Sequence, residues 1–174
     1  MRSTIVDRLR VGAATILAMA LLAMSAGGVA AGKPDKEPLD APPLEFAAGD
    51  VCDFPLLIET TANKEQLKTF YDRDGNAVRQ ILTGKLRTLV TNLTTMETFA
   101  ANTSGPGKFI PNADGTLTLI GGGPWLLYFF PTDVTGAGLW LTKGRIRLEI
   151  DADFNVYEAA LPHNVTDVCE LLAS

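Results

Sequence analysis

The chain has 174 residues and a formal net charge of −5, from 15 basic and 20 acidic side chains. This length fits one domain of ordinary size, and an acidic chain without a cluster of Lys and Arg is not expected to bind nucleic acid. His163 is the only histidine, which excludes a zinc site built from several histidines and leaves one candidate imidazole base. Composition therefore favours a non-catalytic protein and indicates no cofactor.

Residues 1–31 have the pattern of a secretory signal peptide. Three arginines near the start precede an uncharged, mostly apolar stretch at 11–24, and the small residues at 29–31 suit cleavage before Gly32. The stretch is shorter than the roughly 20 apolar residues that span a bilayer. We therefore expect a cleaved signal, a secreted protein, and a mature chain without a membrane span.

Residues 32–50 are rich in proline and in charges of both signs, and they contain few bulky apolar side chains. Such a segment buries too little surface to offset the entropy that it loses on ordering, so we expect a flexible linker. A single β-domain then covers residues 51–174.

The two cysteines, Cys52 and Cys169, lie near the two ends of this domain. In an oxidising compartment, two thiols in one compact domain are expected to form a disulfide. A reactive or metal-bound thiol is the alternative.

From residue 51 onward, Thr and branched aliphatic residues alternate with polar residues, a pattern that predicts β-strands. Within the longest predicted strand, Gly84 is expected to mark a bend. The strands are expected at 54–61, 66–72, 78–92, 96–102, 116–120, 125–130, 139–151 and 156–161. A short helix is predicted at 166–172, with Thr166 as its cap. About eight antiparallel strands joined by short turns indicate an all-β meander, closed as a barrel or packed as a sandwich, with a C-terminal helix.

Three turns repeat one pattern at nearly equal intervals, in residues 72–76, 112–116 and 151–155: Asp or Asn, any residue, Asp, any residue, Asn or Thr. The pattern is typical of hairpin loops in which Asp accepts local backbone hydrogen bonds. The weaker alternative is calcium, which the oxygens of Asp72, Asp74 and Asn76 could help to bind, although a full site needs six to eight oxygens. The sequence indicates no other metal site.

Aromatic side chains concentrate in one region, where Trp125, Tyr128, Phe130 and Trp140 occur close together. Core packing is the simplest explanation. Since 125–130 is apolar throughout, we expect both faces of this strand to be covered, or one face to meet a partner. The alternative is a cavity or patch for an apolar small molecule, a cell-wall component or another protein. These residues favour a binding or interaction module, with a cyclase or isomerase-like barrel enzyme acting on a small apolar substrate as the second hypothesis.

Several short motifs carry a resemblance to a known group. They are C-x-F-P at 52–55, D-G-N at 74–76, S-G-P-G at 104–107 followed by N-A-D-G at 112–115, G-P-W at 123–125 and D-V-C at 167–169. In these motifs the chain resembles small secreted actinobacterial proteins of uncharacterised function. The resemblance implies an exported β-domain and supplies no catalytic residues. A looser similarity, of architecture alone, is to the β-barrel of allene oxide cyclases and dirigent proteins.

Overall fold

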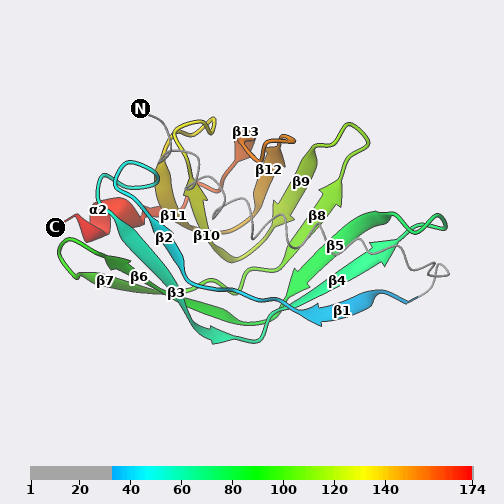
Figure 1. Ribbon diagram of the computed structural model, residues 1–174, viewed down its shortest axis with the longest axis horizontal. Coiled ribbons are helices and arrows are strands. Elements are labelled where there is room, and N and C mark those ends of the chain that lie inside the picture. The colour runs from blue at the N-terminus through cyan, green and yellow to red at the C-terminus, as the bar shows by residue number, and fades with distance from the viewer. Residues whose placement is uncertain (1–32, 174) are drawn as a thin grey trace, which may run out of the picture.

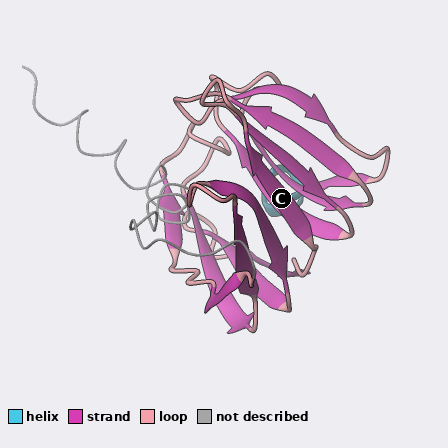
Figure 2. Ribbon diagram, turned by 90° about the vertical axis from the view of Figure 1, so that its right-hand side faces the viewer, coloured by secondary structure: helices cyan, strands magenta, loops and turns pink. Residues whose placement is uncertain are grey.

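A computed structural model describes residues 33–173, so the signal peptide predicted at 1–31 lies outside the described residues. The described chain consists almost entirely of antiparallel strands, and its one short helix lies near the C-terminus (Figure 2). The elements are β1 (Asp35–Pro38), β2 (Leu44–Phe46), β3 (Leu56–Asn63), β4 (Gln66–Tyr71), β5 (Ala77–Thr83), β6 (Leu86–Asn92), β7 (Thr98–Asn102), β8 (Gly107–Pro111), β9 (Leu117–Gly121), β10 (Pro124–Phe129), β11 (Gly138–Lys143), β12 (Ile146–Ile150), β13 (Val156–Ala160), β14 (Val165–Asp167) and α2 (Val168–Leu172).

The strands form three sheets. The largest has seven strands in the order β1-β4-β5-β8-β9-β12-β13, the second has the order β2-β3-β6-β7, and the third has the order β10-β11-β14. In chain order, each strand of the seven-stranded sheet is joined by a corner to a strand of one of the smaller sheets, as Figure 1 shows for β4 and β3 and for β5 and β6. The fold is therefore a meander of long antiparallel strands, each bent once, which confirms the predicted all-β class.

Hydrogen bonds between neighbouring corners keep the bent strands in register. The Leu39 N–H donates to the Glu65 carbonyl at 3.1 Å, and the Lys64 N–H donates to the Lys85 carbonyl at 2.7 Å. At the corner between β5 and β6, Gly84 has φ +142°, and a Cβ there would overlap the Lys64 carbonyl oxygen. The predicted bend is present, and it requires glycine because the next corner lies against it.

The described residues contain fourteen strands, not about eight: two of the predicted strands are each divided at a corner, and four strands, β1, β2, β8 and β14, lie in segments where no strand was predicted. The strand expected at 139–151 is two strands, β11 and β12, separated at Gly144, which has φ +147°. Each sheet has two edge strands, so no sheet of the described chain closes as a barrel. Of the two predicted alternatives, the fold fits sheets packed as a sandwich.

Two strands occur in the segment that was predicted to be a flexible linker. β1 pairs with β4, and β2 pairs with β3, both antiparallel. Every side chain of β1 is exposed, so this strand is held by backbone pairing at a sheet edge and not by apolar burial. The composition of a segment indicates how much apolar surface it can bury, but it does not show whether the backbone of the segment pairs with a distant strand.

The three-stranded sheet is buried on both faces. Leu126 and Tyr128 pack in a core cluster with side chains of the four-stranded sheet, whereas Leu127 and Phe129 pack with side chains of the seven-stranded sheet. This packing explains why residues 125–130 are apolar at every position, and it confirms the expectation that both faces are covered.

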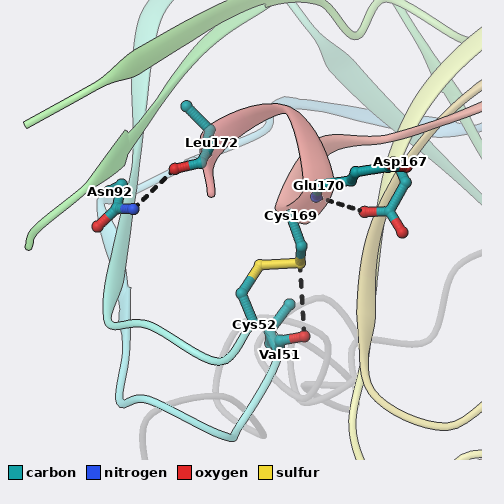
Figure 3. The surroundings of a disulfide bond; sticks show 7 residues. All are labelled: Val51, Cys52, Asn92, Asp167, Cys169, Glu170 and Leu172. Atoms are coloured by element: carbon teal, nitrogen blue, oxygen red, sulfur yellow. Dashed lines mark hydrogen bonds between the residues drawn. A yellow bond between two sulfur atoms is a disulfide. The ribbon is translucent and has the colours of Figure 1, made fainter. Parts of the chain in front are cut away.

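Cys52 and Cys169 form the predicted disulfide, with Cα atoms 5.5 Å apart and a sequence separation of 117 (Figure 3). The same region holds α2 in place, since the Asn92 side-chain amide donates to the Leu172 carbonyl at 2.8 Å. The helix is capped by Asp167, whose carboxylate accepts from the Glu170 N–H at 3.0 Å, and not by Thr166.

Candidate ligand-binding cavity

A cavity of about 230 Å³ lies where the seven-stranded and four-stranded sheets meet. Its wall comes from strands β2 to β6 and β8 to β10, and from the corners between β1 and β2, β3 and β4, and β7 and β8. An apolar protein cavity of roughly 150 Å³ holds benzene, so this one has room for a somewhat larger organic molecule.

Most of the wall is apolar because the strands present their inward faces to it. In β4 and β5, for example, Leu67 and Leu82 point inward from directly paired positions and are both buried. The corner between β1 and β2 forms the rim, where Asp40 and Pro42 line the cavity and are also exposed. The cavity therefore meets solvent at this corner.

Trp125 lies against a row of glycines at one side of the cavity. A Cβ on Gly105 would overlap its indole ring, a Cβ on Gly107 would lie 2.6 Å from its Cζ2, and a Cβ on Gly121 would lie 2.8 Å from its Nε1. The missing side chains make the slot that the indole fills, which gives a structural role to the S-G-P-G motif.

Polar atoms without partners are concentrated on the cavity wall. Within residues 33–173, five buried side-chain nitrogen or oxygen atoms lack a hydrogen-bond partner, and four of them belong to residues that line the cavity. The four are Glu65 Oε2, Thr88 Oγ1, Thr103 Oγ1 and Trp125 Nε1. Since buried polar groups in folded proteins are nearly always hydrogen-bonded, this concentration indicates a site built for a polar group from outside the chain.

Glu65 is the titratable group of greatest interest in the wall. It is only 3% exposed, and burial raises the pKa of its carboxyl to about 7. The corner between β3 and β4 fixes it, because its N–H donates to the Asn63 side-chain oxygen at 2.8 Å and its carbonyl accepts from the Leu39 N–H. Burial also raises the pKa of the Tyr128 hydroxyl, which lines the same cavity.

The aromatic residues singled out from the sequence divide between the cavity and the core. Trp125 and Tyr128 line the cavity. Phe130 packs beside it, with its ring centroid 6.0 Å from those of Tyr128 and Phe46, and Trp140 packs in the cluster against the seven-stranded sheet.

Sequence reasoning missed Glu65, Thr88 and Thr103. Glu65 and Leu67 are two positions apart, so alternation places the carboxyl on the inward face. An acidic residue that alternates in step with buried leucines was the one feature of the sequence that could have indicated a buried carboxyl group here.

The three repeated turns lie at one end of the seven-stranded sheet, between β4 and β5, β8 and β9, and β12 and β13. Asp72 Oδ1 accepts from the N–H groups of Asp74 and Asn76 at 2.9 and 2.8 Å, so it stabilises the turn itself. Within residues 33–173, no group of three His, Cys, Asp or Glu side chains gathers to hold a metal. Calcium binding at Asp72, Asp74 and Asn76 stays a prediction.

Comparison of the chain with family models, curated proteins and solved structures gives no match. In the described part of the chain, no helix has the length and apolar character needed to cross a membrane.

Proposed function

We propose that this protein is a secreted domain that binds a small, mostly apolar molecule in its cavity. The observation that carries the proposal is the set of four unpartnered polar atoms on an otherwise apolar wall. Ligand sites commonly combine an apolar lining with a few polar groups that orient the ligand. The disulfide supports export, since such bonds persist in oxidising compartments.

A cavity favours a small molecule over the two other partners considered, a cell-wall component and another protein. Trp125 and Tyr128 lie at the cavity and pack against other described side chains, and they do not form a broad exposed patch. The aromatic region therefore suits an enclosed ligand better than a flat partner surface.

Titration calorimetry with 2-naphthol, a neutral two-ring molecule, tests this proposal. We expect one molecule to bind per chain. Leu82→Phe, which places a larger side chain in the cavity wall, should abolish binding, whereas Val78→Phe, at an exposed position on the same strand, should leave it unchanged. Cooperative urea unfolding would show that both variants fold. Failure of the unmodified protein to bind, or equal binding by Leu82→Phe, would count against the cavity.

A second candidate function is the cyclase or isomerase activity, which Glu65 favours. A buried carboxyl with a pKa of about 7 gains and loses a proton readily near neutral pH. As a carboxylate it could take a proton from the carbon beside a ligand carbonyl and return it to another carbon, while a hydroxyl of the wall such as that of Thr88 donates to the carbonyl oxygen and stabilises its negative charge.

Deuterium exchange tests this second candidate. A small β,γ-unsaturated ketone incubated with the protein in D₂O should gain deuterium and shift its double bond, and Glu65→Gln should stop both changes while still binding the ketone. Equal exchange by Glu65→Gln would exclude Glu65 as the base.

A further inference from the structure

We propose that the cavity selects a cationic ligand, an apolar amine whose ammonium group pairs with the Glu65 carboxylate. This inference rests on the proposed binding function and names the chemical class of the ligand.

The charges around the cavity support a cation. Among the described residues that line it, none is Lys, Arg or His, whereas Asp40 and Glu65 both contribute carboxyl groups. The ion pair found among the described residues joins Arg147 and Glu149 at 2.7 Å, so Glu65 has no cation from the described chain. A buried carboxylate without a partner is costly, and a ligand cation removes that cost.

The corner that carries Glu65 lies beside the rim of the cavity. Its backbone is bonded to Leu39, directly before Asp40 at the exposed rim. Lys64 and Lys85, on the corners beside it, are exposed and do not line the cavity. An entering ammonium group therefore passes one carboxylate at the rim before it reaches the second inside, while both repel an anion such as a fatty acid.

The other polar atoms describe the far end of the ligand. Thr103 directly follows β7, and Glu65 lies in the corner that follows β3. In the four-stranded sheet β3 and β7 are two positions apart, which corresponds to roughly 10 Å at about 4.8 Å per strand. Trp125 Nε1 can only donate a hydrogen bond, and it has no acceptor among the described residues. The ligand therefore carries its ammonium group at one end, an apolar body, and a carbonyl or hydroxyl oxygen toward the other.

Three probes with one eight-carbon chain test the charge selection: n-octylamine, n-octanol and n-octanoate. Calorimetry at pH 7.5 should show at least tenfold tighter binding of octylamine than of octanol, and no binding of octanoate. Glu65→Gln should lose the preference for octylamine and keep the binding of octanol. Glu45→Gln, which removes an exposed carboxylate from β2, should behave like the unmodified protein.

The pH dependence gives an independent readout. Octylamine stays charged from pH 5.5 to 8, so its affinity should follow ionisation of Glu65: constant above about pH 7 and falling by up to about tenfold per unit below it.

The outcomes separate the two proposals. Octanol binding as tightly as octylamine, or a Glu65→Gln variant that keeps the preference, would overturn the charge selection and leave the binding function in place. Binding of none of the three probes, together with failure of 2-naphthol, would overturn both.

Discussion

Glu65 and Asp72 flank the same strand, β4, yet their surroundings shift their pKa values in opposite directions. Glu65 is buried in the cavity wall, and burial raises the pKa of its carboxyl to about 7. Asp72 begins a surface turn, where hydrogen bonds from the backbone and then the side chain of Asn76 lower its pKa. At neutral pH the turn keeps a full charge, whereas the cavity holds a carboxyl that is charged about half of the time.

Glu65→Gln should therefore make the stability of the unliganded protein less dependent on pH. The folded pKa lies above the ordinary value of 4.5, so the folded state binds the proton more tightly, and stability is lost as pH rises from 4.5 through about 7. At about 1.4 kcal/mol per pKa unit, the loss approaches roughly 3 kcal/mol at pH 8. Glutamine avoids it, so the variant should gain stability relative to the unmodified protein between pH 5 and pH 8.

Urea unfolding at these two pH values measures the difference. Glu45→Gln is the matched control, since an exposed carboxylate should change stability by the same small amount at both. A Glu65→Gln effect that is equal at pH 5 and pH 8 would contradict the raised pKa.

At the scale of elements, the sequence predicts strands well where alternating burial forms them. β4 and β5 show the expected alternation of buried and more exposed side chains, and Gly84 marks a true corner. β1, β2, β8 and β14 were missed, and the last of these includes two residues that were predicted to be helical. β1 has only exposed side chains and exists because β4 offers an edge to pair with, which is a contact between distant parts of the chain.

The cavity was only partly predictable, for a related reason. The aromatic run pointed to Trp125 and Tyr128 because such a cluster is visible locally. Thr88 lies within an ordinary strand and Thr103 directly follows one, and their role is apparent only because the bent sheets bring both to one wall without partners. The sequence does not distinguish residues of the cavity wall from core residues such as Trp140, because the distinction depends on which face of the folded sheet each residue occupies.

The slot that Gly105, Gly107 and Gly121 form around Trp125 gives a prediction at this scale. Gly121→Ala should destabilise the protein by about 1–3 kcal/mol, because the new methyl group would lie 2.8 Å from both Trp125 Nε1 and Ile146 Cγ1. It should also shift the tryptophan fluorescence and weaken ligand binding, since Trp125 lines the cavity. Gly122→Ala is the matched control, because a Cβ there meets nothing within 4 Å. Urea unfolding followed by fluorescence compares the two, and similar losses in both variants would rule out the slot.

At the scale of the whole molecule, the fold is one meander in which each long strand bends once and contributes to two sheets. The repeated turns occur at nearly equal intervals because each repeat contains two such strands. The bend places the four-stranded and three-stranded sheets beside each other, although their neighbouring strands β7 and β10 share no hydrogen-bonded ladder. Side-chain packing, the disulfide and the hydrogen bond from Asn92 to the Leu172 carbonyl therefore hold these two sheets together.

Loss of the disulfide should destabilise the whole domain. Cys52 follows the first bent strand and Cys169 follows the last, so the bond ties the beginning of the meander to its end across 117 positions. Removing such a bond typically costs about 2–5 kcal/mol. We expect a reductant to lower the urea midpoint of the unmodified protein. The Cys52→Ala/Cys169→Ala variant should start from a comparably low midpoint that the reductant does not change.

The cavity lies mainly between the seven-stranded and four-stranded sheets, so ligand affinity measured at urea concentrations well below the midpoint should change less than stability does. An unchanged midpoint after complete reduction, confirmed by thiol labelling, would show that packing alone holds the two smaller sheets together.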